Sequence, residues 1–171
     1  GGLSFLAETA PTRAAKVREE VERLSRGSSQ EVDIGQLVAG TIESARRLAQ
    51  ERAVEIDVMP PLPGLNVTAN RVMLRQAVLN LLSHMVCAEA AHDAAGQVTV
   101  AIERADGDAV VHLSYHRGPA DGAPPSESPY AVAAQLLDSL GIRWTQTTVD
   151  GGATRVSLYI PLAQEHSVLI V

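Results

Sequence analysis

One stretch of this 171-residue sequence carries polar groups at a spacing that could do chemistry. Asn80 and His84 are four residues apart, in a segment that reads Leu-Arg-Gln-Ala-Val-Leu-Asn-Leu-Leu-Ser-His. On a helix this spacing is about one turn, so the amide and the imidazole would point the same way and could hold a cation together. The competing interpretation is a half-buried helix. Its apolar side would be formed by Leu74, Val78, Leu81, Leu82 and Met85.

Other histidine and cysteine pairs predict no metal site. His84 and Cys87 are three residues apart and could share an ion, but no two further ligands stand at a suitable spacing. A buried cysteine and a capped histidine are therefore preferred. His112 and His116 share a strand face about 13 Å apart, at roughly 3.3 Å per residue, which is too far for one ion and favours a surface pair. No nucleophile elbow supports Ser-His-Asp chemistry, so we predict no catalytic residues.

Composition narrows the class of protein and its surroundings. The length fits about one domain with a real core, and 46% hydrophobic residues fit a folded chain. A net charge of −6 argues against nucleic acid as a main partner. No run of 18 apolar residues exists, so no membrane contact is expected. The single cysteine, Cys87, excludes an internal disulfide and favours a reducing, cytoplasmic setting.

The first half of the chain reads as helix, helix and strand. Residues 11–26 predict a helix whose narrow apolar face, Val17, Val21 and Leu24, suits a two-helix seam. Asp33 is placed to cap a second helix that ends near Arg52. Its inner side would carry Ile34, Leu37, Val38, Ile42, Ala45 and Leu48. Residues 54–58 alternate apolar and polar, which predicts a strand with one buried face.

The second half predicts the helix around Asn80 and a set of strands. A short strand near residues 66–68 leads into that helix, at about residues 70–91. Residues 97–104 and 109–116 form a hairpin through Asp106-Gly107-Asp108. A third core helix covers residues 130–140, and strands at 142–149 and 154–160 follow. This order predicts a two-layer α/β sandwich, with a mixed sheet and about three helices on one face.

Several segments resemble the ATPase domain of histidine kinases, of the Bergerat fold. The segment around Asn80 resembles their N box, Leu-Arg-Gln-x-Leu-x-Asn-Leu-x-x-Asn-Ala. Val32-Asp33-Ile34 resembles the opening of that domain and Ala53-Val54-Glu55-Ile56 its first strand. Residues 150–154 resemble its Gly-x-Gly-Thr turn, and residues 155–162 its closing strand ending in Leu-Pro. The resemblance covers residues 31–164 and implies that fold.

The resemblance also implies a nucleotide site, and this sequence departs from it. In the family the second Asn of the N box chelates the Mg²⁺ of Mg-ATP, and here that position is His84. The G1 box, Asp-x-Gly-x-Gly, falls on residues 116–120, where His116 replaces the adenine-binding Asp. Gly118 is retained and Ala120 replaces the second Gly. A neutral imidazole offers one acceptor where a carboxylate offers two oxygens and a charge.

The phosphate-binding G2 box departs further. Its two glycines align with Glu127 and Pro129, and Pro has no N–H to donate. A lysine common three residues after the second Asn is Cys87 here. The sequence therefore predicts a vestigial nucleotide site at Asn80, His84, His116 and Gly118, with no bound cofactor. The alternatives are a divergent but active domain that binds Mg-ATP, and a protein-interaction module on the same fold.

The resemblance also implies partners at the two ends of the chain. In the family a helical dimerisation hairpin that carries a phosphoacceptor His precedes this domain, and residues 1–30 are expected to be a helical linker that could be the tail of that hairpin. The hairpin and a homodimer are therefore expected partners, while none of the five histidines here precedes residue 84 to serve as the phosphoacceptor. Residues 165–171 form either a strand that covers a sheet edge or the start of a receiver domain. A receiver or response regulator is thus the second expected partner.

Overall fold

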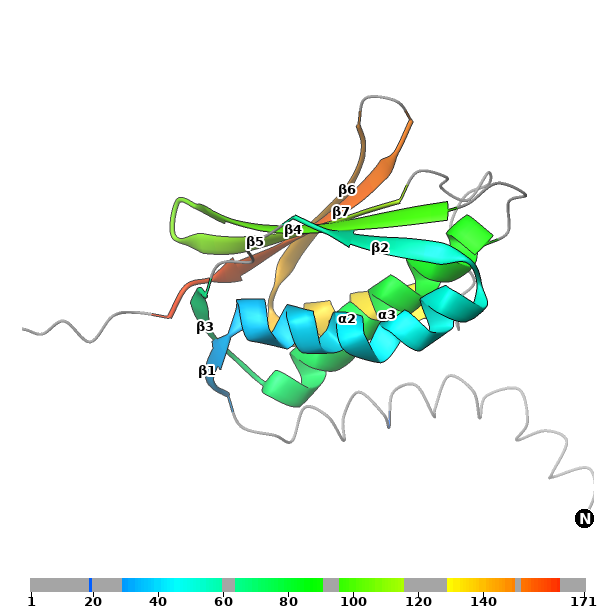
Figure 1. Ribbon diagram of the computed structural model, residues 1–171. Coiled ribbons are helices and arrows are strands. Elements are labelled where there is room, and N and C mark those ends of the chain that lie inside the picture. The colour runs from blue at the N-terminus through cyan, green and yellow to red at the C-terminus, as the bar shows by residue number, and fades with distance from the viewer. Residues whose placement is uncertain are drawn as a thin grey trace, which may run out of the picture.

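The computed structural model describes Glu19 and residues 29–59, 64–90, 96–115, 129–149 and 152–163. Figure 1 shows a sheet lying over a layer of helices. In chain order the elements are β1 (Gln30–Asp33), α2 (Ile34–Glu51), β2 (Val54–Val58), β3 (Asn66–Ala69), α3 (Arg71–Ala90), β4 (Gly96–Ala105), β5 (Asp108–Tyr115), α4 (Pro129–Leu140), β6 (Arg143–Thr148) and β7 (Thr154–Pro161).

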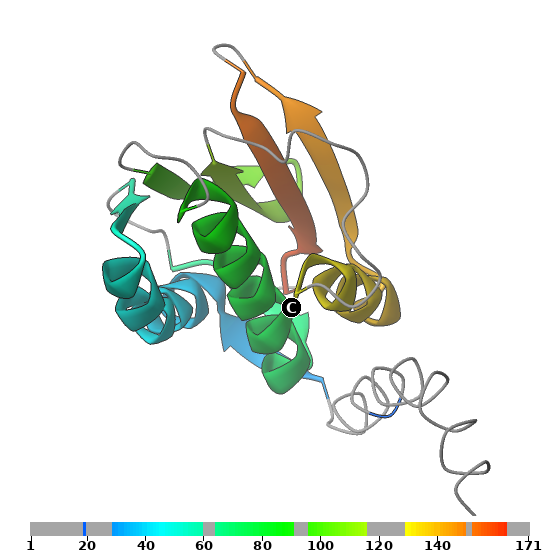
Figure 2. The ribbon, with the colours of Figure 1, turned by 90° about the vertical axis from the view of Figure 1, so that its right-hand side faces the viewer.

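The main sheet has five strands in the order β2-β4-β5-β7-β6. β2 pairs with β4 in parallel, and the other three pairings are antiparallel. α2, α3 and α4 lie on one face of this sheet, with α3 between the other two (Figure 2). The predicted two-layer sandwich with a mixed sheet is therefore confirmed.

Helix caps and a tight turn end the elements close to the predicted residues. The Asp33 carboxylate accepts a hydrogen bond from the Gln36 backbone N–H at 3.1 Å and caps α2, as expected. Asn70 does the same for α3, through the Met73 N–H at 3.2 Å. The β4–β5 turn places Asp106 at φ 54° and Gly107 at φ 113°. These positive values are those that a tight hairpin turn requires, and they explain the Asp-Gly pair.

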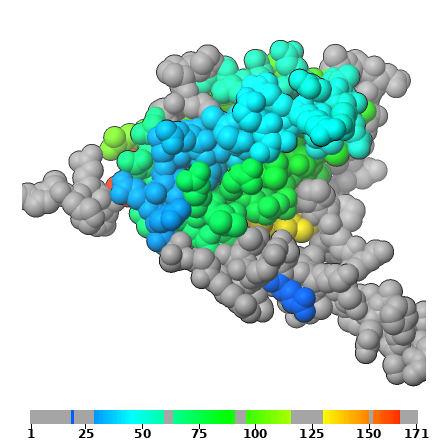
Figure 3. Space-filling model, turned by 60° about the horizontal axis from the view of Figure 1, so that its bottom comes forward, coloured from blue at the N-terminus to red at the C-terminus, as the bar shows by residue number. Residues whose placement is uncertain are grey.

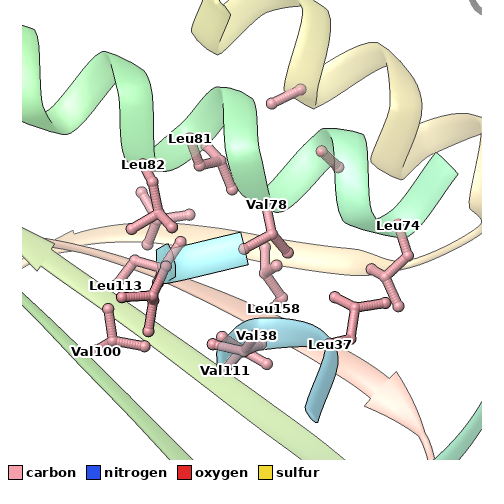
Figure 4. Packing of buried hydrophobic residues seen from close by; sticks show 14 of the residues in the cluster. Leu37, Val38, Leu74, Val78, Leu81, Leu82, Val100, Val111, Leu113 and Leu158 are labelled. Carbon is pink, nitrogen blue, oxygen red and sulfur yellow. The ribbon is translucent and has the colours of Figure 1, made fainter. Parts of the chain in front are cut away.

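The core lies between the inner face of the sheet and α2, α3 and α4. Figure 4 shows Leu74, Val78, Leu81 and Leu82 of α3 directed at apolar residues of the strands. Among those residues are Val100, Val111, Leu113 and Leu158, all 0% exposed. Burying each such side chain stabilises the fold by about 1.5–3 kcal/mol. This layer fixes the rotation of α3, and so fixes which of its polar groups reach solvent.

A second, two-stranded sheet was not predicted. β1 pairs antiparallel with β3, with Gln30 opposite Ala69. Leu162 makes an isolated antiparallel bridge to Val67, on the chain leaving β7. β3 is thus paired both with β1 and with Leu162, the residue that follows β7. It leads directly into α3.

One side-chain prediction is wrong, and two predicted segments are untested. Leu48, expected on the inner side of α2, is half-buried and packs against the core. Cys87 is exposed, where a buried cysteine was preferred, because it lies on the side of α3 away from the sheet. The predicted helix at 11–26 (Glu19 excepted) and the C-terminal segment at 165–171 fall outside the described residues. Within the described ranges, no helix is long and apolar enough to cross a membrane.

Candidate functional site

α3 places Asn80 and His84 on the same side, both half-buried, as the four-residue spacing predicts. The Asn80 side-chain oxygen accepts a hydrogen bond from the Gln76 amide nitrogen at 2.8 Å, one turn earlier on the helix. One acceptor of the amide is therefore engaged within the protein. A cation approaching Asn80 would have to compete with this bond.

The His84 ring packs between two tyrosines from different elements. Its centroid lies 6.1 Å from that of Tyr115, at the end of β5, in an edge-to-face arrangement. It lies 5.1 Å from that of Tyr130, in the first turn of α4. Tyr130 in turn meets Trp144 of β6 at 5.8 Å. We call these four residues the aromatic cluster; it joins α3, α4 and the sheet.

Burial sets the electrostatics of the aromatic cluster. It lowers the pKa of His84, so the imidazole stays neutral at neutral pH. Burial also raises the pKa of Tyr115, against the effect of a hydrogen bond with Thr154 and with a smaller contribution from Glu89. The pKa of Tyr130 rises to about 12, through burial and then through Tyr115. Its hydroxyl donates a hydrogen bond to the Gln146 side-chain oxygen. The cluster is thus a neutral, largely desolvated set of rings.

A buried carboxylate fixes the far end of α3 against the sheet. Glu89 is 1% exposed, and its Oε2 accepts the backbone N–H of Gln97 at 3.2 Å. Gly96 faces this side chain so closely that an added Cβ would lie 2.6 Å from the Cβ of Glu89. Only glycine fits there without a shift. This contact, beside Tyr115, helps to hold α3 at a fixed height over the sheet.

The described residues supply few ligands for Mg²⁺. That ion prefers oxygen ligands in near-ideal octahedral geometry. His84 offers a ring nitrogen, and Asn80 offers an amide oxygen that is already hydrogen-bonded. Across the described ranges, no group of three or more His, Cys, Asp or Glu side chains could hold a metal ion.

The other predicted site residues cannot be placed. His116 and Gly118 lie outside the described residues, as do Ala120 and Glu127. Pro129 opens α4. The structure therefore brings Asn80 and His84 together on α3 and leaves the G1 and G2 predictions untested.

Sequence reasoning missed the other three members of the aromatic cluster, Tyr115, Tyr130 and Trp144. A signal was available, because aromatic residues make up only 3% of the chain. Tyr115 immediately precedes the G1 position, and Tyr130 immediately follows the G2 position. Trp144 gave no comparable signal, since its approach to Tyr130 depends on how β6 lies beside α4.

His112 has a structural place on the outer face of the sheet. Its Nδ1 lies 2.8 Å from the Ser157 hydroxyl, and its Nε2 lies 3.1 Å from the Glu103 carboxylate. The Ser157 side chain is 4% exposed, so a substrate could not reach its oxygen. This group is a cross-strand polar link between β4, β5 and β7 and not a hydrolytic triad.

Comparisons with known proteins identify the fold. No family model matches the sequence, and no curated protein matches it. Among solved structures, the mycobacterial sensor histidine kinase MprB superposes with a TM-score of 0.64 at 18% identity, over 78% of this chain and 97% of that one. The catalytic domain of histidine kinase ThkA gives 0.67 at 12% identity, over the same shares. The Acinetobacter baumannii histidine kinase AdeS gives 0.68 at 10%, over 94% and 83%. The chain thus has the fold of histidine kinase catalytic domains.

Proposed function

We propose that residues 31–164 are a degenerate ATPase-like domain of a two-component signalling histidine kinase. The domain acts by docking and by the geometry of a dimer, in the cytoplasm, and it does not transfer phosphoryl groups. Its partners are the dimerisation hairpin of the same protein and a receiver domain or response regulator. The observation that carries the proposal is the packing of His84 between Tyr115 and Tyr130.

His84 stands where the N box would offer its second asparagine to Mg²⁺. A neutral imidazole supplies nitrogen where the ion prefers oxygen. Turning the ring toward a metal would also give up its contacts with Tyr115 and Tyr130. Aromatic pairs of this kind are worth about 0.5–1.5 kcal/mol each beyond the area they bury. Both effects disfavour the metal-bound state.

The sequence adds an electrostatic reason at the phosphate end. Glu127 aligns with a position where backbone N–H groups would meet the triphosphate. Two like charges at about 4 Å repel by about 1 kcal/mol in water, and by more where water is excluded. Pro129 aligns with the other glycine and has no N–H to give. Each departure weakens the same ligand, so their effects accumulate.

An active domain with divergent motifs is the second candidate, and Asn80 favours it. This residue matches the first asparagine of the N box and is only half-buried. Its bond to Gln76 joins two side chains of one helix, and a strong ligand could displace it. In that case Asn80 and His84 would face Mg²⁺ together.

Thermal unfolding with and without Mg-ATP separates the two candidates. A ligand that binds at a Kd of about 100 μM, present at about 5 mM, stabilises the folded state by about 2.3 kcal/mol. For a domain of this size that raises the Tm by roughly 5–9 °C. We expect no rise above that given by Mg²⁺ with tripolyphosphate, the control for nonspecific anion binding. A nucleotide-specific rise of several degrees would refute the proposal.

A further inference from the structure

One stripe of α3, on the side that faces away from the sheet, contains no charged residue. Val72, Gln76, Leu79, Ser83 and Cys87 recur there at spacings of three and four, opposite the buried leucines. We call these five residues the α3 stripe. Val72 is 58% exposed, an unusual position for a large apolar side chain in this domain. Figure 3 shows α3 in green, open to the surface beside α2 in blue and cyan.

α2 shows what an ordinary solvated helix face looks like in the same layer. Its outer side carries the ion pairs Glu43–Arg46, at 2.8 Å, and Arg47–Glu51, at 3.5 Å. The outer side of α2 is thus charged, and the lack of charge on the α3 stripe is specific to α3. An uncharged stripe with exposed valine and cysteine is typical of a surface that another element covers.

The fold brings one specific segment to the start of this stripe. In the β1–β3 pair, Gln30 lies opposite Ala69. Ala69 is followed by Asn70, which caps α3. Gln30 therefore lies beside the start of α3, where Val72 is exposed. The sequence of the preceding chain, residues 11–26, predicts a helix with a narrow apolar face.

We infer that residues 11–26 dock on the α3 stripe of the same chain as an antiparallel helix. Packed helix axes lie about 8–10 Å apart. Residues 27–29, Gly-Ser-Ser, can span about 10 Å when extended, which is enough for this crossing. With equal rise along both helices, about 1.5 Å per residue, Leu24 lies level with Val72 and Val17 level with Leu79. Val21 then lies level with Arg75, an exposed residue at the edge of the α3 stripe.

Electrostatic attraction and the short linker both favour residues 11–26 as the segment that covers the α3 stripe. Arg71 and Arg75 lie at the start of α3, and Arg75 donates to the Ser44 hydroxyl at 2.9 Å. The docked segment would bring Glu19, Glu20 and Glu22 to this basic end. A linker of three residues also gives an effective concentration in the millimolar range, so a modest apolar contact suffices.

Docking has a regulatory consequence. The helix predicted at residues 11–26 has a single apolar face, formed by Val17, Val21 and Leu24. A hairpin partner and the α3 stripe would both need that face. Docking in cis and dimerisation through this segment therefore exclude one another. This competition does not depend on whether the domain binds nucleotide.

Disulfide trapping tests the docked arrangement. In the full chain with Cys87→Ser, the pair Val17→Cys and Leu79→Cys should form an intramolecular disulfide under mild oxidation, because docking brings their Cα atoms within the roughly 4.4–6.8 Å that a bridge needs. The matched control, Val17→Cys with Gln50→Cys, places its second thiol on the exposed side of α2 and should stay reduced. A covalent dimer would show that a second copy is the occupant. That result, or no bridge in either pair, would overturn the inference.

A substitution within residues 11–26 tests whether the apolar face of this predicted helix contacts the α3 stripe. Val21→Lys, which adds a positive charge to the apolar face level with the exposed Arg75, should slow formation of the disulfide between positions 17 and 79 by about tenfold or more, a loss of about 1.4 kcal/mol in docking. Ala15→Lys, which adds the same charge on the opposite side of the predicted helix, should leave the rate unchanged. Because docking stabilises the folded domain, Val21→Lys should lower its free energy of unfolding in the full chain by no more than the lost docking energy, and Ala15→Lys should leave it unchanged. Equal rates in the two variants would contradict docking through this face.

Discussion

Replacing His84 by asparagine restores the residue of the N box and removes a ring from the aromatic cluster. The imidazole contacts Tyr115 and Tyr130 at centroid distances of 6.1 and 5.1 Å. At about 0.5–1.5 kcal/mol for each contact, His84→Asn should lower the free energy of unfolding by roughly 1–3 kcal/mol. A loss of about 2 kcal/mol lowers the Tm of a domain of this size by roughly 4–8 °C.

Urea denaturation at about pH 7.5 measures this loss. Ser83→Asn is the control, because it introduces the same amide at the neighbouring half-buried position; its effect should stay within about 0.5 kcal/mol. A double-mutant cycle of His84→Asn with Tyr130→Leu should give a coupling energy of about 0.5–1.5 kcal/mol. No coupling, or a variant as stable as the parent chain, would refute the packing role of His84.

Acid gives a second measurement on the same variant. Because the pKa of His84 is lowered in the folded state, the unfolded chain binds a proton more readily. The stability from a neutral His84 is therefore complete above about pH 6.5, its unfolded value, and declines as pH falls below it. The difference in stability between the parent chain and His84→Asn should shrink from about pH 7.5 to about pH 5.5. A difference that grows would contradict the burial of a neutral imidazole.

Three further substitutions test single features of the structure by chemical denaturation. Asn80→Ala should cost about 1–3 kcal/mol if its bond to Gln76 is structural; an unchanged midpoint, with loss of a measurable nucleotide affinity, would make Asn80 a ligand residue. Gly96→Ala should cost about 1–3 kcal/mol, because the new methyl meets the Glu89 Cβ at 2.6 Å, and Gly40→Ala, which meets nothing within 4 Å, is its control. Ala53→Gly should stabilise the fold by up to about 1 kcal/mol, since Ala53 follows α2 at φ 56°, where glycine is unstrained; a loss of stability would show that the alanine methyl packs usefully.

Local signals predicted most elements, and tertiary contacts decided the rest. Asp33 and the Asp106-Gly107 turn fix α2 and the β4–β5 hairpin through bonds between near neighbours in sequence, so they could be read directly. The pairing of β1 with β3 could not, because it joins residues far apart in the sequence, such as Gln30 and Ala69. The error at Cys87 has a simple origin. A lone cysteine resembles a small core residue, and only the rotation of α3 shows that it faces outward.

The candidate site was predicted less completely than the fold. The four-residue spacing correctly placed Asn80 and His84 on one side of α3. The partners of His84 come from β5 and α4, and spacing within one helix carries no information about them. The hydrogen bond from Gln76 to Asn80, by contrast, is a local contact of the kind that helical spacing allows.

Isothermal titration of the chain with ATP in the presence of Mg²⁺ measures whether the site still binds nucleotide. We predict no saturable heat up to millimolar ATP, both for the parent chain and for His84→Asn, because the substitutions at positions 116, 120, 127 and 129 remain. A Kd below about 100 μM, equivalent to about −5.5 kcal/mol, would contradict a degenerate site and establish a working ATP-binding domain.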